Sequence, residues 1–334
     1  AMSGTLLLSA ADVRAVLPMG DCIAAVEAGF RLLAEGGVEQ GVLGIHTGGG
    51  GFHLKAAAVR VPRPCFVAKL NGNFPDNPAR FGLPSIQGVV ALCDAENGRL
   101  LALLDSAEIT RLRTGAATAV AARYLARPDS AVLTLFGCGR QAESQVEALM
   151  EVLPIARVWL NDPAPGAADR LADRLRTWLG IESGGVEGVA LSRALARSDV
   201  IVTCTPSRRF FLTRAMVPRG AFVAGVGTDD SRKQELEPEL LAENTVVADV
   251  LDQCLAIGDL HHAHSTGLMT RQQVHAELAE VVAGAKSGRK DREEITLFDS
   301  TGTAVEDVAA AALCYERASA AGRGFTMHFE GGTP

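Results

Sequence analysis

A glycine-rich segment in the middle of the sequence has the residue types that bind a dinucleotide. Residues 137–142 (GCGRQA) follow the apolar run AVLTLF, which is typical of a strand, and precede a helical pattern. In such a motif Gly137 permits a tight turn, Gly139 lets the backbone approach a pyrophosphate, and Ala142 lets helix and strand pack closely. The helix N-terminus then offers N–H groups to the phosphates. The predicted dinucleotide-binding residues of this loop are Gly137, Gly139, Arg140, Gln141 and Ala142.

An acidic residue ends the next predicted strand. Asp162 closes the run RVWLND, 25 positions after Gly137. A carboxylate at this place accepts hydrogen bonds from the adenosine ribose and repels a 2′-phosphate. Since no arginine occurs in the following PAPGAA, the pattern favours NAD over NADP as cofactor. The alternative for Asp162 is a solvated turn residue before Pro163.

Several longer stretches resemble the ornithine cyclodeaminase/μ-crystallin family. They occur in order from about residue 65 to residue 315 and include EITRLRTGAATAVAARYLA, GCGRQA, GVGTDDSRKQELEPELL and ITLFDSTGTAVEDVAAA. The resemblance implies a substrate-binding and dimerisation domain built from both chain ends, with a Rossmann domain inserted between them. The family includes cyclising deaminases, alanine dehydrogenases, imine reductases and crystallins that bind thyroid hormone.

The resemblance also implies roles for individual residues. Lys69 matches a lysine near the substrate carboxylate or imine, Arg113 an arginine that binds the carboxylate, and Asp229 an acid that handles the substrate amine. Ser85 falls where some members have a hydroxyl near cofactor and substrate. The positions that match the lining of the cofactor site are Thr114, Thr205, Val226 and Ser300.

The chemistry of these side chains agrees with those roles. The planar guanidinium of Arg113 suits a carboxylate. Lys69 lies among apolar residues of a predicted strand, where burial lowers a lysine pKa toward the range of proton transfer. Asp229 follows a predicted parallel strand, at the edge where open α/β sheets bind ligands. In the alternative reading, Arg113 is a surface charge on a helix, Lys69 extends to solvent, and Asp229 caps a turn.

One region departs from the family pattern. Members usually carry an arginine in the N-terminal hairpin and a Met-Pro pair on the returning strand, but this chain has no arginine between residues 32 and 59. Lys55 is our candidate replacement for substrate binding. His53 shares its face, since strand side chains repeat every two residues, and is a further candidate. The departure weakens a specific prediction of ornithine cyclisation.

We therefore expect an NAD(H)-dependent oxidoreductase that acts at the α-carbon of a small amino or imino acid. In this hypothesis Lys69 and Asp229 are catalytic. One alternative is a lyase that takes a hydride from its substrate and returns it, as ornithine cyclodeaminase or a hydroxyproline dehydratase would. The other is a non-catalytic, crystallin-like binding protein.

The apolar periodicity places these residues on an α/β fold. Helices are expected over residues 9–36, from Glu108 to Leu125 and after residue 303, and the glycines of HTGGGGFHLKAAAV form a hairpin turn. After Pro128 short β-rich runs alternate with helical patterns, which predicts a doubly wound parallel sheet. The predicted strands of this region are 131–136, 157–162, 199–205, 221–227, 245–250 and 295–300. Before it, the stretches CFVAKLNGNF and SIQGVVALCDAENGRLLALLD are also predicted to form strands, with a turn at Asn97-Gly98 in the second. The predicted substrate domain comprises residues 1–127 and 304–334, and the Rossmann domain residues 128–303.

Composition limits the partners. The formal net charge of −7 argues against nucleic acid binding, and no stretch approaches the roughly 18 apolar residues of a membrane span. Seven scattered cysteines without a C-x-x-C motif fit reduced thiols in the cytoplasm. The histidines of GDLHHAHSTG lack an acidic partner at useful spacing, so no metal site is expected. The family resemblance implies a homodimer.

Overall fold

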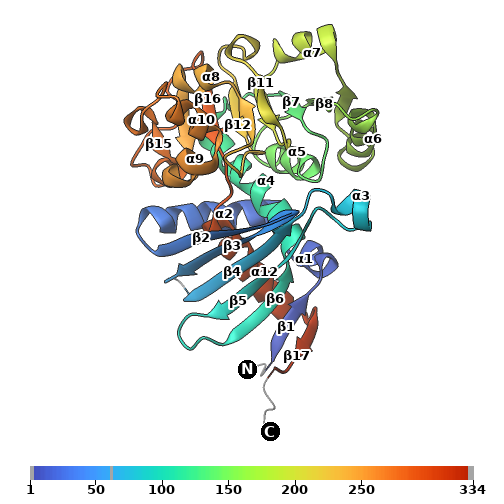
Figure 1. Ribbon diagram of the computed structural model, residues 1–334, viewed down its shortest axis with the longest axis vertical. Coiled ribbons are helices and arrows are strands. Elements are labelled where there is room, and N and C mark those ends of the chain that lie inside the picture. Colours follow the sequence, from blue (N-terminus) through green and yellow to red (C-terminus); the bar gives the residue numbers. More distant parts are fainter. Residues whose placement is uncertain (1–3, 61–62, 330–334) are drawn as a thin grey trace. The chain divides into compact units, whose positions relative to one another are not determined.

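The computed structural model describes residues 4–60 and 63–329, which form two compact units (Figure 1). Unit 1 takes the chain up to Arg113 and again from Thr303, and unit 2 takes residues 114–302. The predicted boundary after residue 127 lies at the end of helix α4 (Ser106–Leu125), whereas the contacts divide this helix near its middle. The reason is close packing within unit 2: a Cβ on Gly115 would lie 2.5 Å from the carbonyl oxygen of Ser144.

Unit 1 contains a seven-stranded sheet. Its strands run in the order β17 (Phe325–Met327), β1 (Thr5–Leu8), β6 (Leu100–Asp105), β5 (Ile86–Asp94), β4 (Cys65–Asn73), β3 (Gly50–Val59) and β2 (Val38–Thr47). Only the β1–β6 pair is parallel among these described strands. The expected glycine-rich hairpin is β2–β3, which confirms the prediction for this turn. Strands β1 and β17 were not predicted.

Helices cover one face of this sheet. The helices of unit 1 are α1 (Ala10–Val16), α2 (Met19–Ala34), α3 (Asn77–Phe81), the first turns of α4, and α12 (Ala304–Ala321). The hydroxyl of Ser9 caps α1, which begins within the predicted helical range 9–36, and pairs with Asp12. Helix α12 contacts strands β2 to β6 and lies tightly against α2, where a Cβ on Gly29 would lie 3.3 Å from the side chain of Val305. The chain end therefore completes the core of the N-terminal sheet.

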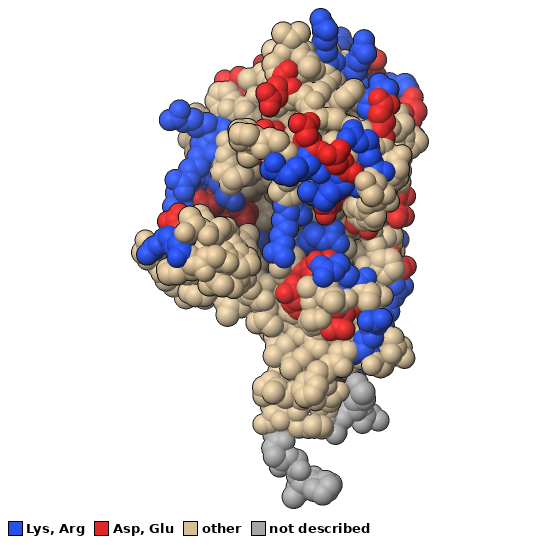
Figure 2. All heavy atoms as spheres, turned by 90° about the vertical axis from the view of Figure 1, so that its right-hand side faces the viewer, with Lys and Arg blue, Asp and Glu red and all other residues tan. Residues whose placement is uncertain are grey.

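The other face of the sheet carries an exposed apolar row. Leu43 lies opposite Leu54, which lies opposite Leu70, which lies opposite Val89, so that the row crosses four strands. Leu43, Leu70 and Val89 are 54%, 44% and 36% exposed. In Figure 2, the part of unit 1 next to the chain termini shows almost no charged side chains. Isolated exposed leucines are ordinary, but a contiguous row is typical of a contact surface.

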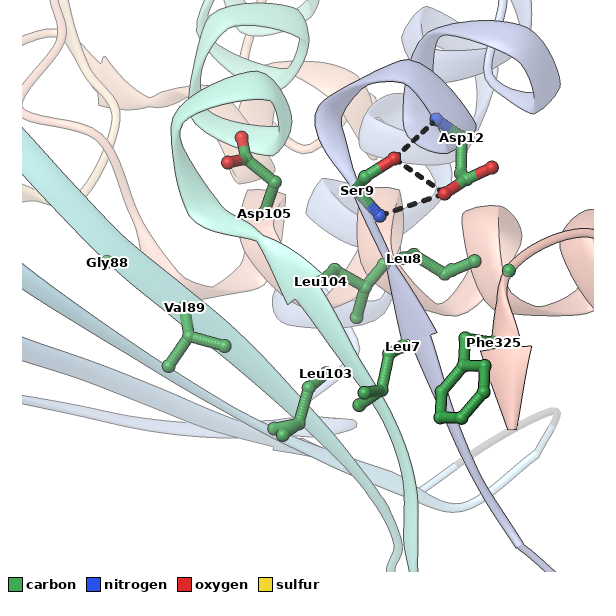
Figure 3. Close-up of a pocket in the computed structure, with 11 residues that line it drawn as sticks. Leu7, Leu8, Ser9, Asp12, Gly88, Val89, Leu103, Leu104, Asp105 and Phe325 are labelled. Atoms are coloured by element: carbon green, nitrogen blue, oxygen red, sulfur yellow. Dashed lines mark hydrogen bonds between the residues drawn. The ribbon is translucent and has the colours of Figure 1, made fainter. Parts of the chain in front are cut away.

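The apolar character continues toward the β17 edge of the sheet. A surface hollow of about 570 Å³ is lined by Leu7, Val89, Leu103 and Phe325 together with polar residues at the start of α1. Figure 3 shows these four side chains pointing to the same side, and Leu7 lies directly opposite both Leu103 and Phe325. None of the predicted site residues lines this hollow.

Unit 2 is a Rossmann domain with an eight-stranded, fully parallel sheet. Its strands run in the order β9 (Glu182–Gly185), β8 (Arg157–Asn161), β7 (Val132–Phe136), β10 (Val200–Thr203), β12 (Phe222–Gly225), β16 (Thr296–Asp299), β14 (Thr245–Ala248) and β15 (Ala276–Glu277). All six predicted strands are present. The fold is thus the predicted α/β class with a doubly wound parallel sheet, and its strand order changes direction between β7 and β10.

The remaining elements of unit 2 connect and cover this sheet (Figure 1). A small two-stranded sheet, not predicted, pairs β11 (Arg208–Leu212) with β13 (Gln234–Leu236). The helices are α5 (Ala142–Met150), α6 (Ala167–Leu179), α7 (Gly188–Leu195), α8 (Pro238–Ala242), α9 (Leu251–Ile257), α10 (Asp259–Ser265) and α11 (Leu278–Val282). In the described part of the chain, no helix combines the length and apolar character needed to cross a bilayer.

Candidate active site

The glycine loop lies where the strand order of unit 2 reverses. Gly137 follows β7 with φ of 91°, and a Cβ there would lie 2.7 Å from the carbonyl oxygen of Cys204, so the position requires glycine. A Cβ on the exposed Gly139 would meet no atom within 4 Å among the described residues. Protein packing therefore leaves this backbone open to a ligand. Ala142 is fully buried and begins α5.

Asp162 is held beside this loop. One carboxylate oxygen, Oδ2, accepts a 2.7 Å hydrogen bond from the backbone N–H of Cys138, and Oδ1 accepts one of 2.8 Å from Ala164. The carboxylate therefore fastens the end of β8 to the glycine loop and also bonds the turn that follows it. An ionised carboxylate has about four acceptor positions, and these two bonds leave capacity for ribose hydroxyls.

Three other predicted cofactor residues follow the carboxyl ends of neighbouring strands. Thr205 follows β10, Val226 follows β12, and Ser300 follows β16. The hydroxyl oxygen of Ser300 is buried and has no hydrogen-bond partner within the described ranges. An unpaired buried hydroxyl is costly, so this atom fits a position that a ligand completes. Thr114 is buried on α4, while Arg140 lies exposed in the glycine loop.

A buried glutamate that the sequence analysis missed joins two of these loops. Glu235 on β13 accepts hydrogen bonds from the Thr203 hydroxyl at 2.7 Å, from the Thr205 N–H at 2.6 Å and from the Gly227 N–H at 2.8 Å. Burial, together with the nearby Asp259, raises the pKa of Glu235 to about 7. Its carboxyl group therefore fixes the backbone around Thr205 and at the start of the segment that carries Asp229.

Asp229 lies on the loop after β12, with its side chain 46% exposed. Its Oδ1 accepts a 2.5 Å hydrogen bond from Nζ of Lys233, four residues further on. This contact gives the carboxylate a partner within its own loop. Lys233 was not singled out from the sequence.

In unit 1 the two predicted cations meet two acids of α12. Oδ1 of Asp307 accepts a hydrogen bond from Lys69 Nζ at 2.8 Å, and Oδ2 lies 2.7 Å from the same nitrogen. Arg113 donates from an Nη to Glu306 at 2.7 Å, and its Nε lies 3.0 Å from Asp307 Oδ1. All four side chains are at most 6% exposed. Arg113 and Lys69 are therefore buried network members, not surface charges.

The same burial changes the acid–base properties of Lys69. Burial, together with the positive charge of Arg113, lowers the pKa of Lys69 to about 7, although Asp307 opposes the change. Burial alone would raise the pKa of Asp307, but Lys69 and Arg113 hold it below its ordinary value. The pair thus combines a carboxylate that stays ionised with an amine that exchanges protons near neutral pH.

Comparison with known proteins identifies the family of this chain. The model of the Ornithine cyclodeaminase/mu-crystallin family matches residues 3–322. The chain belongs to this family. The relatives of known structure include an archaeal alanine dehydrogenase dimer with bound NAD, which is 36% identical with a TM-score of 0.92 and coverage of 98% of this chain and 99% of that one.

Two further members show the range of chemistry in the family. A Δ1-pyrroline-2-carboxylate reductase from Thermococcus litoralis, in complex with NADH and L-proline, is 32% identical with a TM-score of 0.92, covering 97% of this chain and 100% of that one. A lysine cyclodeaminase that recognises L-lysine, L-ornithine and L-2,4-diaminobutyric acid is 33% identical with a TM-score of 0.85, covering 98% and 96%. Reductases and lyases therefore share this fold.

The β2–β3 hairpin places Lys55 beside Lys69. The two lysines are directly opposite each other on β3 and β4, where like charges repel. His53 lies on the same face of β3, and its ring is 6.2 Å from that of His46. Because of the β3–β4 pairing, Lys55 adds positive charge next to Lys69.

Ser85 precedes β5, and its carbonyl oxygen accepts a hydrogen bond from the Phe74 N–H.

The acids of α12 had a signal in the sequence that we did not use. Glu306 and Asp307 are adjacent charges in a helix otherwise rich in alanine and valine, and buried acids require cations. By contrast, the rings of His261, His262 and His264 each form a hydrogen bond with a backbone carbonyl.

Proposed function

We propose that the protein is an NAD(H)-dependent oxidoreductase that acts at the α-carbon of a small amino or imino acid. The observation that carries the proposal is the buried network of Lys69 and Arg113 with Glu306 and Asp307, whose two cations suit the carboxylate of an amino or imino acid. The similar proteins named alanine dehydrogenase and Δ1-pyrroline-2-carboxylate reductase, the latter in complex with L-proline, support this substrate class. The fold, the glycine loop and the NAD-bound relatives support the choice of cofactor.

The residues of unit 2 fit a dinucleotide. Gly139 leaves its backbone open, Asp162 carries acceptor capacity for ribose hydroxyls, and Ser300 has a buried hydroxyl without a partner among the described residues. We propose that these residues, with Gly137, Arg140, Gln141, Ala142, Thr114, Thr205 and Val226, hold NAD. When bound, its nicotinamide supplies or accepts the hydride at the substrate α-carbon.

The side chains of the protein would orient the substrate and move its protons. Arg113 binds the substrate carboxylate through its planar guanidinium, and Lys55 adds positive charge. Lys69 as an ammonium donates a hydrogen bond to the carboxylate or the imine. Asp229 gives or takes the proton at the substrate nitrogen. His53 and Ser85 are proposed to contact the substrate.

A direct assay tests this function. The purified protein would be incubated with NAD⁺ and a panel of amino acids, or with NADH, oxo acids and amines, while NADH absorbance and products are followed. Net cofactor turnover is expected. Product without net change in NADH would instead establish a lyase that returns its hydride, the alternative that the lysine cyclodeaminase relative supports. Cofactor binding without any product would favour a binding protein.

We also propose that the enzyme prefers NAD to NADP, and substitution of Asp162 tests this preference. The wild type is expected to favour NADH over NADPH by about a hundredfold in kcat/KM, because a like charge near the 2′-phosphate costs several kcal/mol. Asp162→Ser is expected to reduce this preference to about tenfold or less. Asp173→Ser, which removes an exposed acid on α6, is the matched control and should keep the wild-type ratio. An unchanged ratio in Asp162→Ser would contradict the assignment.

We further propose that the protein is a homodimer formed through the exposed face of the unit 1 sheet. The apolar row of Leu43, Leu54, Leu70 and Val89 and the dimeric alanine dehydrogenase support this. The seven cysteines are all free thiols, which fits a reducing compartment such as the cytoplasm.

Disruption of the row tests the dimer. Leu70→Arg places a charge in its middle and is expected to convert a dimer into a monomer at about 10 µM, since burying an unpaired charge costs several kcal/mol. Light scattering after size exclusion measures the mass. Val189→Arg changes another exposed apolar residue, 70% exposed on α7, and should leave the dimer intact. A dimeric Leu70→Arg protein would show that another surface forms the contact.

A further inference from the structure

Asp307 is the side chain through which the two substrate-binding cations are connected. Its two oxygens lie 2.8 and 2.7 Å from Lys69 Nζ, and Oδ1 also lies 3.0 Å from Arg113 Nε. Lys69 comes from β4 and Arg113 from α4, and the contact of α4 with Lys69 Nζ is a long one, 3.4 Å from the neutral hydroxyl of Thr110. A single fully buried carboxylate on α12 touches both, so it sets their mutual position.

Glu306, the acid adjacent to Asp307, also contacts Arg113. Glu306 Oε2 accepts from Arg113 at 2.7 Å, while its Oε1 accepts from the N–H and the hydroxyl of Thr303, at 3.0 and 2.9 Å. Glu306 is thus engaged with the helix N-terminus and with Arg113. Asp307 is the acid in contact with Lys69. The two neighbours therefore serve as a matched pair for experiment.

The charges that face Lys69 leave Asp307 as its counter-charge. From α4 it faces Arg113 and, at 3.4 Å, the neutral hydroxyl of Thr110; from β3 it faces Lys55; from α12 it faces Asp307. Two of these groups are cations and disfavour a charged Lys69. Asp307 is the group among them that favours the ammonium, the form that donates to a carboxylate or an imine.

We propose that Asp307 is a positioning residue for turnover, which fixes the Lys69 ammonium and one edge of the Arg113 guanidinium and keeps Lys69 protonated for its contact with substrate. This inference rests on the proposed function. Asp307 neither touches the substrate nor changes its own protonation, since it is buried between two cations and remains ionised.

The test compares Asp307→Asn, Asp307→Glu and Glu306→Gln by two readouts. The first is the pH profile of kcat/KM for the imine substrate found in the activity panel. The second needs no turnover: binding of pyrrole-2-carboxylate, a planar unreactive anion, measured by calorimetry between pH 5.5 and 9. Thermal unfolding of each variant is recorded alongside.

For Asp307→Asn, the alkaline limb of the profile and the pH at which anion binding weakens should both move at least one pH unit lower, with about a tenfold loss of kcat/KM at pH 7.5 that is largely recovered at pH 6. Asp307→Glu retains the charge and should keep the wild-type limb, with a lower kcat/KM because its carboxylate is displaced. Glu306→Gln should also keep the alkaline limb of the wild type.

An Asp307→Asn profile that falls uniformly, without movement of the limb, would overturn the inference. If Asp307→Asn does not fold, an Asp307→Glu limb displaced from the wild type overturns it as well. Absence of both turnover and anion binding in the wild type would instead refute the proposed function.

Discussion

Replacement of Arg113 by methionine is expected to lower kcat/KM for the amino or imino acid by about a thousandfold, which corresponds to about 4 kcal/mol. The reason is that the guanidinium is buried, ion-paired and proposed to bind the substrate carboxylate through paired donors. Steady-state kinetics measures the loss, and fluorescence titration with NADH should show cofactor affinity within about twofold of the wild type.

The same variant tests the buried network. Arg113→Met leaves Glu306 and Asp307 with less positive charge around them, and the free energy of unfolding is expected to fall by about 3–5 kcal/mol. The double variant Arg113→Met with Glu306→Gln should recover part of this loss, since both partners of one pair are then neutral. It should not recover activity. Arg113→Lys keeps the positive charge but loses the paired, planar donors of the guanidinium. We expect its kcat/KM to remain at least about thirtyfold below that of the wild type. A near-normal kcat/KM in Arg113→Met would show that Arg113 does not bind the substrate carboxylate.

The pH dependence of imine reduction is expected to follow Lys69. Its pKa of about 7 lies below the ordinary lysine value, because burial and Arg113 disfavour the charge. The ammonium is therefore the main form below pH 7 and the neutral amine above it. Reduction needs the ammonium as donor, so kcat/KM should fall about tenfold per pH unit above pH 7, while oxidation in the reverse direction should rise over the same range.

Two variants test whether Lys69 causes the fall in kcat/KM above pH 7. Lys69→Arg stays charged at all accessible pH values, so its profile should lack the limb near pH 7, at a lower overall rate. Lys69→Met should lose about 10²- to 10⁴-fold at its optimum, the range for a general acid. If Lys69→Arg keeps the wild-type limb, another group titrates there, and Lys69 is not the donor.

The sequence predicted the Rossmann unit well because its signals are local. Runs such as residues 131–136 are short, β-rich and largely buried, and the glycine loop and Asp162 are separated by one helix, α5, and one strand, β8. The same reasoning did not find β1, β15 and β17, which have between two and four residues each. Such short strands form because a neighbouring strand offers hydrogen bonds, and this neighbour cannot be inferred from the strand itself.

The candidate site was predicted only in part for a related reason. Lys69 and Arg113 were identified through the family resemblance, but their partners Asp307 and Glu306 lie 238 and 193 positions away in the chain. Pairing at that separation is decided by how α12 packs on the sheet, which periodicity does not reveal. Glu235 was missed similarly, since its role depends on which loops meet at the end of β10 and β12.

The return of α12 to the N-terminal sheet has a consequence for biosynthesis. At about 5–20 residues per second, the ribosome needs roughly 10–40 s to translate unit 2 after Arg113 has been made. During this interval the sheet of unit 1 has strands β1 to β6 but lacks α12, the helix that packs against β2 to β6, and Lys69 lacks its carboxylate. The nascent chain therefore exposes apolar surface on both faces of one sheet and is a natural client for chaperones until α12 leaves the ribosome.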